Sequence, residues 1–299
     1  MIIIKSKNIL VHAIGYTLFF GIITLQAIPI YQADIDAGLV ITQQGTWELA
    51  QSVTFVVPCA ISILADNVTL NLQNYTMDGQ AIGECAISVT GNNCLILNGL
   101  IQATTQTAIQ INDSTGSVVE QMTIQNAQDG ISVTNSGYTN INNITVHDNE
   151  GYAIAVYGES DGTTIGQALI YHCTTYGIIV ASNTASLTGI TIYGITGDGV
   201  QLIGDNIQCY FVSSSLNTGN GFLIAGQTNT LQLCYASQNG IDGMQLATTS
   251  SGVSIIGGIS SGNANIGIDN LGATSNTASF VDVRKNKVRD LWRIVNGRS

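Results

Sequence analysis

Basic side chains are missing from nearly the whole of this 299-residue sequence. Between residues 8 and 283 there is no Lys or Arg, although 18 of the 19 Asp and Glu fall there. The eight basic residues lie at the two ends: Lys5, Lys7, Arg284, Lys285, Lys287, Arg289, Arg293 and Arg298. A body without cations cannot neutralise phosphates, so the sequence excludes nucleic-acid binding by the main domain. It also lacks the Arg or Lys that many enzymes use to hold anionic substrates.

Charge of either sign is scarce, since only 9% of the residues are charged and the formal net charge is -11. Hydrophobic residues nevertheless make up 45% of the chain. This composition excludes a disordered chain or a low-complexity tail. The length is sufficient for one large domain or two ordinary ones.

The first residues have the features of an export signal. Lys5 and Lys7 precede an apolar stretch over residues 9–25, and Leu25-Gln26-Ala27 is an acceptable cleavage site. The sequence therefore predicts a signal peptide over residues 1–27, with an uncleaved N-terminal membrane anchor as the alternative. No second apolar run of membrane length follows, so we expect a secreted or cell-surface protein. In that compartment the six cysteines can form disulfides.

A repeat covers most of the chain. Its anchor is a small residue followed by an apolar one, and successive anchors follow one another at a nearly constant step. The anchors begin at Ala60, Ala86, Ala108, Gly130, Ala153, Gly177, Gly199, Gly221, Gly243 and Gly267. Alternating apolar and polar residues around them predict short strands, and no helical spacing extends over ten residues. Strands in a 22–26-residue repeat without a crossover helix predict a parallel β-helix of about ten coils, spaced by about 4.8 Å.

The repeat also predicts rows of stacked polar side chains. Asparagines recur four positions before several anchors, at Asn126, Asn149, Asn217, Asn239 and Asn263. Amides in register can hydrogen-bond along the axis of the β-helix and satisfy polar groups at an inward turn. We therefore expect an asparagine ladder.

The start of the repeat region resembles a known family. Residues 45–79 read GTWELAQSVTFVVPCAISILADNVTLNLQNYTMDG, which is similar to the first coils of right-handed parallel β-helix proteins of the pectin-lyase-like superfamily. The resemblance covers residues 45–283 and implies an all-β, right-handed solenoid. It implies no single activity, because the superfamily contains lyases, hydrolases, epimerases, phage tailspikes and non-catalytic surface proteins.

The known chemistries of this superfamily do not transfer to the sequence. Its lyases use a catalytic Arg or Lys, and residues 8–283 contain neither. Its polygalacturonase-like hydrolases use an adjacent Asp pair, a Gly-His-Gly and an Arg-Ile-Lys. This sequence has no Asp-Asp and no Gly-His-Gly, and its nearest third element is Arg293-Ile294-Val295 in the tail. The sequence therefore favours a non-catalytic protein.

One window, from Tyr138 to Tyr176, concentrates chemically useful side chains. His147 and His172 are separated by slightly more than one local step of the repeat, so we expect them on adjacent coils. A His near carboxylates can do general acid or base work, and tyrosines offer stacking faces for sugars. The predicted ligand-binding residues are Tyr152, Tyr157, Tyr171 and Tyr176. The alternative is that these side chains are structural, with both His pointing outward and the tyrosines partly buried.

A second candidate is the row formed by Asp198, Asn220 and Asp242. Two coils separate the acids, which would place their carboxyl groups about 9.6 Å apart, near the limit for an inverting glycosidase pair. A weak calcium site formed by these acids and turn carbonyls is an alternative. Each residue also precedes a glycine at the same turn, which is a sufficient structural reason for it.

The cysteines allow one specific prediction. CAIS occurs at Cys59 and again at Cys85, and identical register on neighbouring coils would place the two residues within disulfide distance. We therefore predict that this pair is stacked and can form a disulfide. Cys209 and Cys234 are separated by more than the local repeat step and fall out of register, and the sequence does not pair Cys94 or Cys173. Without a close CxxC, we expect no metal bound by cysteine.

The ends of the solenoid need covering. In the basic tail, residues 284–299, apolar residues recur at helical spacing at Val288, Leu291, Trp292 and Val295, which predicts a short C-terminal capping helix. A basic arm that contacts an anionic surface or a partner is the alternative. At the other end, Trp47 with Leu49 and Val53 could supply a cap.

Together these observations predict an exported β-helix domain over residues 28–283, with binding or surface structure as its role. The expected partner is a neutral polysaccharide or cell-surface glycan, because a polyanion would meet 18 acids and no cation unless calcium bridged them. No cofactor is expected. The runner-up is a glycoside hydrolase-like, polysaccharide-acting enzyme that uses carboxylates and His. A structural or adhesive role, in an oligomer, is the third class.

Overall fold

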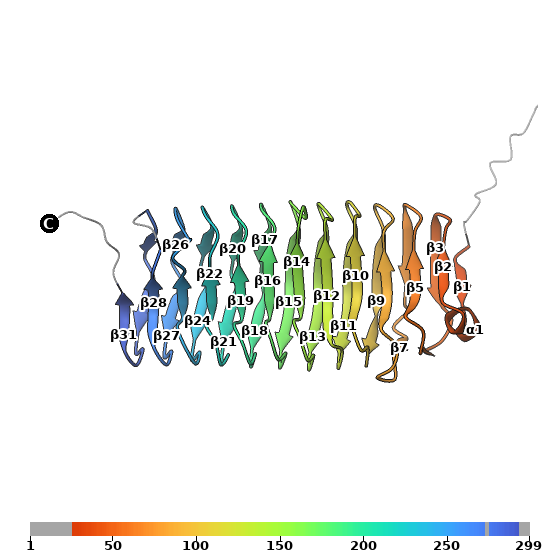
Figure 1. Cartoon of the computed structure of the whole chain (residues 1–299), viewed down its shortest axis with the longest axis horizontal. Coiled ribbons are helices and arrows are strands. Elements are labelled where there is room, and N and C mark those ends of the chain that lie inside the picture. Colours follow the sequence, from red (N-terminus) through yellow and green to blue (C-terminus); the bar gives the residue numbers. More distant parts are fainter. Residues whose placement is uncertain (1–25, 273–274, 293–299) are drawn as a thin grey trace, which may run out of the picture.

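The computed structural model describes residues 26–272 and 275–292, which coil into a rod of stacked strands (Figure 1). Every strand pairing in this part of the chain is parallel, and each strand pairs with its equivalent one coil away. The pairings form two long sheets, sheet A with 19 strands and sheet B with 12. The predicted parallel β-helix is confirmed.

The strands of the two sheets alternate along the chain. Sheet A contains β1 (Ile28–Ile30), β3 (Gly45–Leu49), β4 (Val53–Thr54), β6 (Val68–Asn71), β7 (Thr76–Asp78), β9 (Leu95–Gln102), β11 (Val118–Gln125), β13 (Asn140–His147), β15 (Thr164–Tyr171), β17 (Ser186–Thr188), β18 (Thr191–Tyr193), β20 (Gln208–Tyr210), β21 (Ser213–Ser215), β23 (Thr230–Gln232), β24 (Tyr235–Ser237), β26 (Ser254–Ile256), β27 (Ile259–Ser261), β29 (Thr277–Ser279) and β30 (Asp282–Arg284). Sheet B contains β2 (Leu39–Ile41), β5 (Cys59–Ile63), β8 (Cys85–Val89), β10 (Thr107–Asn112), β12 (Asp129–Thr134), β14 (Ile154–Tyr157), β16 (Ile178–Ala181), β19 (Val200–Leu202), β22 (Phe222–Ile224), β25 (Met244–Leu246), β28 (Ile266–Asn270) and β31 (Arg289–Trp292).

The core runs the length of the rod because each strand alternates inward and outward residues. In β13, Ile141, Ile144 and Val146 are buried, whereas the residues between them face outward. The anchor repeat appears directly in the register of sheet B, where Ile109 pairs with Ile87 on one side and Ile131 on the other. Identical apolar side chains therefore stack above one another and bury most of their surface against the next coil.

An asparagine ladder runs along the core, from coil to coil, in the C-terminal half of the rod. The Asn217 amide NH2 donates to Asn239 Oδ1 at 3.0 Å, and the Asn239 amide NH2 donates to Asn263 Oδ1, also at 3.0 Å. Each Oδ1 also accepts a backbone N–H from the preceding coil. The prediction is wrong for Asn126, which is exposed, because Ala127 occupies the ladder row there and its N–H donates to Asn149 Oδ1.

The two ends of the rod are covered differently from the sequence prediction. A helix lies at the N-terminal end, where α1 (Gln32–Asp36) packs against β2, β4 and β5 with Ile35 buried (Figure 1). Trp47, Leu49 and Val53, expected in that cap, lie in or at the ends of β3 and β4. The predicted C-terminal helix is wrong for residues 289–292, because β31 pairs there with β28 and extends sheet B.

Sheets A and B therefore continue past residue 283, since β30 and β31 both carry regular parallel pairings. Val295 and nearly all of the predicted signal peptide lie outside the described residues. Within the described part of the chain, the one helix is five residues long and far too short to cross a membrane.

Candidate functional site

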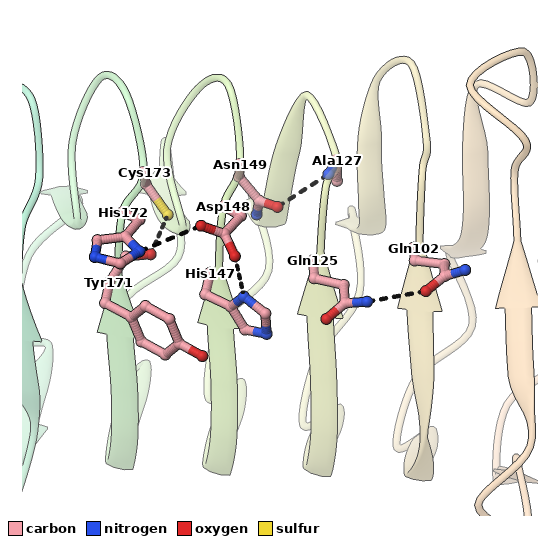
Figure 2. A network of polar contacts seen from close by, with 9 residues as sticks. All are labelled: Gln102, Gln125, Ala127, His147, Asp148, Asn149, Tyr171, His172 and Cys173. Atoms are coloured by element: carbon pink, nitrogen blue, oxygen red, sulfur yellow. Dashed lines mark hydrogen bonds and ion pairs between the residues drawn. The ribbon is translucent and has the colours of Figure 1, made fainter.

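One outward row of sheet A carries a stack of rings. The register of β13, β15, β18 and β21 aligns His147 with Tyr171, then Tyr193, then Ser215. The His147 and Tyr171 rings lie 4.6 Å apart at 3°, and Tyr171 and Tyr193 lie 5.2 Å apart at 4°. We call His147, Tyr171 and Tyr193 the ring ladder. Figure 2 shows that Gln125 and Gln102 continue the row on the preceding strands, joined by a hydrogen bond.

A single carboxylate links the two predicted histidines. His147 Nδ1 lies 2.7 Å from Asp148 Oδ2, and His172 Nδ1 lies 3.3 Å from Asp148 Oδ1 (Figure 2). A carboxylate only accepts hydrogen bonds, so each Nδ1 facing it carries the proton. In the neutral form, each Nε2 is then left as the basic nitrogen. The sequence predicted the two histidines on adjacent coils, and the structure brings them together through Asp148.

The positions of Asp148 and His172 follow from the backbone. Each is the residue directly after a sheet A strand, and each adopts the left-handed conformation, with φ of 55° and 56°. This conformation turns the chain from sheet A towards sheet B, so both side chains leave the strand row beside the ring ladder. Asp and His tolerate it better than β-branched residues.

The electrostatics of the cluster favour a charged Asp148 and a neutral Tyr171. Hydrogen bonds from His147 and His172 hold the pKa of the Asp148 carboxyl below its usual value. Desolvation raises the pKa of Tyr171, and the neighbouring Tyr193 and Asp148 raise it further. Tyr171 is therefore a hydrogen-bond donor and not a base at neutral pH.

A polar hollow lies in the turns that follow β7, β9, β11 and β13. It has a volume of about 290 Å³ and is lined by Ala81, Thr104, Thr105, Asn126, Ala127, Gln128 and Glu150. Asn126 follows Gln125, which pairs with His147, so the hollow is in the turn of the coils directly preceding Asp148. Its amides, hydroxyls and carboxylate can exchange several hydrogen bonds with a ligand. We call it the polar hollow.

Tyr193 was not among the predicted site residues, although it completes the ring ladder. It lies one common repeat step after Tyr171, and counting forward by that step from Tyr171 would have found it. Because the rings stack along the rod, mainly the ring edges of His147 and Tyr171 are exposed to solvent. The far face of Tyr193 lies over Ser215, whose side chain is too small to cover a ring.

The other predicted tyrosines form a separate group on the sheet B side. The Tyr152 and Tyr157 rings lie 6.4 Å apart, edge to face, and no ring contact joins them to the ring ladder among the described residues. Burial and the nearby Asp129 raise the pKa of Tyr152, while burial raises that of Asp129. Tyr176 lies in the same row as Tyr152, two residues before the start of β16. The four predicted tyrosines therefore belong to two sites.

Asp198 and Asp242 have structural partners. Asp198 accepts the N–H of Asn220 at 2.6 Å and a side-chain N–H of Gln201 at 2.8 Å. Asp242, which is fully buried, accepts the N–H of Ile266 and side-chain N–H groups of Gln245 and Asn265. Their carboxylates hold adjacent turns together, the structural role that the sequence offered as the alternative.

Cys59 and Cys85 are paired in register, as predicted, with Sγ atoms 3.1 Å apart as free thiols. Cys94, Cys173, Cys209 and Cys234 are buried free thiols. Among the described residues no three His, Cys, Asp or Glu side chains gather into a group that could hold a metal ion.

Comparison with known proteins assigns the fold. A family model described as "Right handed beta helix region" matches residues 37–188, slightly more than half of the chain. The chain belongs to this right-handed β-helix family. No curated protein sequence matches it.

Solved structures resemble this right-handed β-helix over most of its length. The A-module of the mannuronan C-5 epimerase AlgE4 of Azotobacter vinelandii is 12% identical, with a TM-score of 0.70, over 88% of this chain and 84% of the epimerase module. The periplasmic alginate epimerase AlgG is 13% identical, with a TM-score of 0.58, over 82% of this chain and 76% of AlgG. Tailspike protein 2 of bacteriophage CBA120 is 13% identical, with a TM-score of 0.56, over 83% and 40%. At this identity the likeness establishes the pectin-lyase-like fold.

Proposed function

We propose that this β-helix binds a polysaccharide at the ring ladder and polar hollow of sheet A. The observation that carries the proposal is the hollow, about 290 Å³ in volume, which extends to Glu150 in the turn that follows His147 and Asp148. A glycan offers many hydroxyl groups and apolar ring faces. The hollow supplies amides, hydroxyls and a carboxylate for the hydroxyls, and the open face of Tyr193 can pack against a sugar ring.

The charges of the site favour an uncharged glycan. Glu150 lines the hollow, Asp148 precedes it by two residues, and no Lys or Arg occurs between residues 8 and 283. A uronate-rich polymer would be repelled over a distance of about one Debye length, ~8 Å. This repulsion would be offset only if calcium ions bridged the polymer to the carboxylates of the protein. We also propose that the chain acts outside the cytosol, as a secreted or surface protein.

The structural neighbours support the general class of ligand. Two are epimerases named for mannuronan and alginate, and a third is a phage tailspike with an enzymatically active domain. These names associate the same coil architecture with polysaccharides. Because residues 8–283 contain no Lys or Arg, we expect this chain not to bind such acidic polymers directly.

The proposal is tested with the full chain, as recovered from an expressing host, on a glycan array and in pull-downs with insoluble polysaccharides. The expected result is retention by a neutral polysaccharide that is unaffected by a chelator. Tyr193→Ala should weaken binding by about 0.5–1.5 kcal/mol, the range for one aromatic contact. Gln128→Ala, in the hollow, should weaken it independently.

Tyr138→Ala is the matched control. Tyr138 is 74% exposed and lies before the opposite end of β13 from His147, so its loss should leave binding unchanged. Equal loss of binding in Tyr138→Ala and Tyr193→Ala would contradict the site. Tight binding to polygalacturonate in the presence of chelator would contradict the ligand class.

A second candidate, an enzyme that acts on the polysaccharide, is favoured by one observation. Asp148 accepts from the Nδ1 atoms of two histidines and so leaves two Nε2 atoms available as bases. Incubation of the bound polysaccharide with the protein, followed by a reducing-end assay and product chromatography, decides between the two functions. New products that disappear in His172→Gln would establish the enzyme, and unchanged polymer would establish a binding protein.

A further inference from the structure

The C-terminal half of sheet A exposes an apolar surface that the proposed function does not use. Large apolar side chains face solvent on the coils from β15 to β30, and we call this set the apolar face: Leu169, Tyr210, Phe211, Leu216, Tyr235, Ile256 and Phe280. It spans six successive coils, five of which contribute a side chain, or about 24 Å at the strand spacing of a sheet. A standard interface of about 800 Å² per partner is about 28 Å across, so the face is comparable in length.

Two phenylalanines of this face lie at the bend between two strands of sheet A, where Phe211 contacts the ring of Tyr210. Phe211 lies between β20 and β21, Phe280 lies between β29 and β30, and both adopt the left-handed conformation, with φ of 53° and 57°. A bulky residue in this conformation is strained. Phe280 is also 93% exposed, so its ring gains almost nothing from its own chain. Exposed apolar area of this kind marks a surface that binds another molecule.

The charges at the two ends of the apolar face are complementary. At its C-terminal end lie the exposed basic residues Lys285 and Arg284, of which Arg284 is paired with Asp282 at 3.1 Å, and one coil before its N-terminal end lies Asp148. Lys285 and Asp148 belong to one row, because the residues before them, Arg284 and His147, are linked by the register of successive strands through Tyr171, Tyr193, Ser215, Ser237 and Ser261. The row is therefore acidic at one end of the face and basic at the other.

We propose that the apolar face binds a second copy of this chain, with the two rods antiparallel. A two-fold axis along the strand direction, through the centre of the face, reverses the order of coils but keeps each row opposite itself. The first coil of the face then meets the last coil of the partner copy. Lys285 of one copy is carried to the coil of His172 in the other, one coil from Asp148, on both sides of the pair. In a parallel arrangement each coil would face the same coil of the partner copy, so like charges would oppose each other.

Residues 293–299 are a weaker candidate for covering the face. They follow Trp292 at the end of β31, in sheet B, and read Arg-Ile-Val-Asn-Gly-Arg-Ser, with two large apolar residues among seven. A second copy supplies apolar side chains on five of the six coils.

Sedimentation velocity of the full chain over a range of concentrations tests the proposal. The expected result is a monomer–dimer equilibrium. Phe280→Ser should weaken the dimer by at least about tenfold. Because the Phe280 side chain touches so little of its own chain, this variant should fold normally. Tyr138→Ser, at another highly exposed aromatic residue away from the face, should leave the dimer unchanged. A chain that stays monomeric at all concentrations, or equal weakening in both variants, would overturn the proposal.

A charge reversal tests the antiparallel arrangement. Lys285→Glu and Asp148→Lys should each weaken the dimer, and the double variant should restore it, because the same contact is rebuilt with the charges exchanged. Additive weakening in the double variant would overturn the arrangement. A truncation after Trp292 tests the tail: an unchanged dimer supports the second copy as occupant, and a new dimer formed only after truncation would assign the face to the tail. These measurements contain no glycan, so their outcome is independent of the proposed function.

Discussion

The Sγ atoms of Cys59 and Cys85 lie 3.1 Å apart across two adjacent coils, with the two residues paired in register. The hydrogen bond between the thiols lowers the pKa of Cys59, and it raises the pKa of Cys85, as burial also does. Cys59 is half-buried and Cys85 is 4% exposed. The pair therefore combines an accessible, more acidic thiol, Cys59, with a buried thiol, Cys85, that can form a disulfide with it.

We predict that oxidised glutathione converts this pair to a disulfide. The Cys59 thiolate attacks the glutathione disulfide and releases one glutathione thiol, and Cys85 then displaces the second while losing its proton. The new link closes a loop of 26 residues and should stabilise the protein by about 3 kcal/mol. Thermal unfolding with and without reductant measures the effect, and mass spectrometry locates the link. Cys85→Ser should abolish the shift, whereas Cys209→Ser, at a buried thiol elsewhere, should not.

Loss of one asparagine from the ladder should be costly. Asn239 Oδ1 accepts from both the N–H and the side-chain NH2 of Asn217, and its own NH2 donates to Asn263. Asn239→Ala leaves the buried N–H of Asn217 without a partner and removes the hydrogen bonds from the Asn239 side chain to Ser214 and Asn263. We expect a loss of about 2–4 kcal/mol in the free energy of unfolding, measured by denaturant titration. Asn140→Ala, at the exposed asparagine that begins β13 outside the ladder, should change it by less than about 0.5 kcal/mol.

Glycine at the later anchors is required by the ladder. A Cβ on Gly243 would lie 2.6 Å from both the Asn263 side-chain nitrogen and the Gly267 carbonyl oxygen. We expect Gly243→Ala to destabilise the protein by at least about 2 kcal/mol, because backbone on the next coil would have to move. Gly137→Ala is the control, since the new Cβ would meet only the Asp161 carbonyl, at 3.3 Å. Similar denaturation midpoints for the two variants would show that the coils can separate freely.

The pH dependence of stability should depend on Asp148. Its pKa is lower in the folded protein than the value of about 3.9 expected in the unfolded chain. The stability it contributes is therefore present above about pH 4 and is lost as the pH falls through the folded value. The gap between wild type and Asp148→Asn should close between pH 5 and about pH 2. Because the side chain is 45% exposed, we expect a gap below about 1 kcal/mol.

Urea titrations at these pH values measure that gap. Glu159→Gln, which removes an exposed carboxyl on the following coil, is the control and should run parallel to wild type. A gap that widened on acidification would show that the contact between Asp148 and the histidines does not stabilise the fold.

The fold could be predicted from the sequence because one physical rule acts at every coil. A side chain in a solenoid stacks on the equivalent side chain one repeat away, so the spacing of anchors such as Ala108 and Gly130 already specifies the register. The pairing of Cys59 with Cys85 followed from the same rule.

The rule failed where a turn gains or loses a residue. The anchor step from Gly130 to Ala153 is one position longer than the ladder step from Ala127 to Asn149, because the second turn contains one more residue. Counting from the anchor therefore placed Asn126 in the ladder in place of Ala127.

The candidate site was predicted only in part for a related reason. The density of tyrosines in the sequence does not show the direction in which the chain turns. Tyr171 ends a strand of sheet A and Tyr176 precedes a strand of sheet B, so a short turn separates two different surfaces. The linking role of Asp148 depends on its left-handed backbone conformation, which composition does not reveal.

The regular spacing between Gly199 and Gly221 makes one coil a removable module. Deletion of residues 199–220 would bring Gly221 to the place of Gly199 and Asn239 to the place of Asn217, because every pairing across this coil is displaced by the same step. The rod would shorten by about 4.8 Å with its core and ladder intact. In an antiparallel pair both copies would lose the same coil, so the basic end of each would still meet the acidic end of the other. The length of such an assembly can therefore change by whole coils without redesign of its contacts.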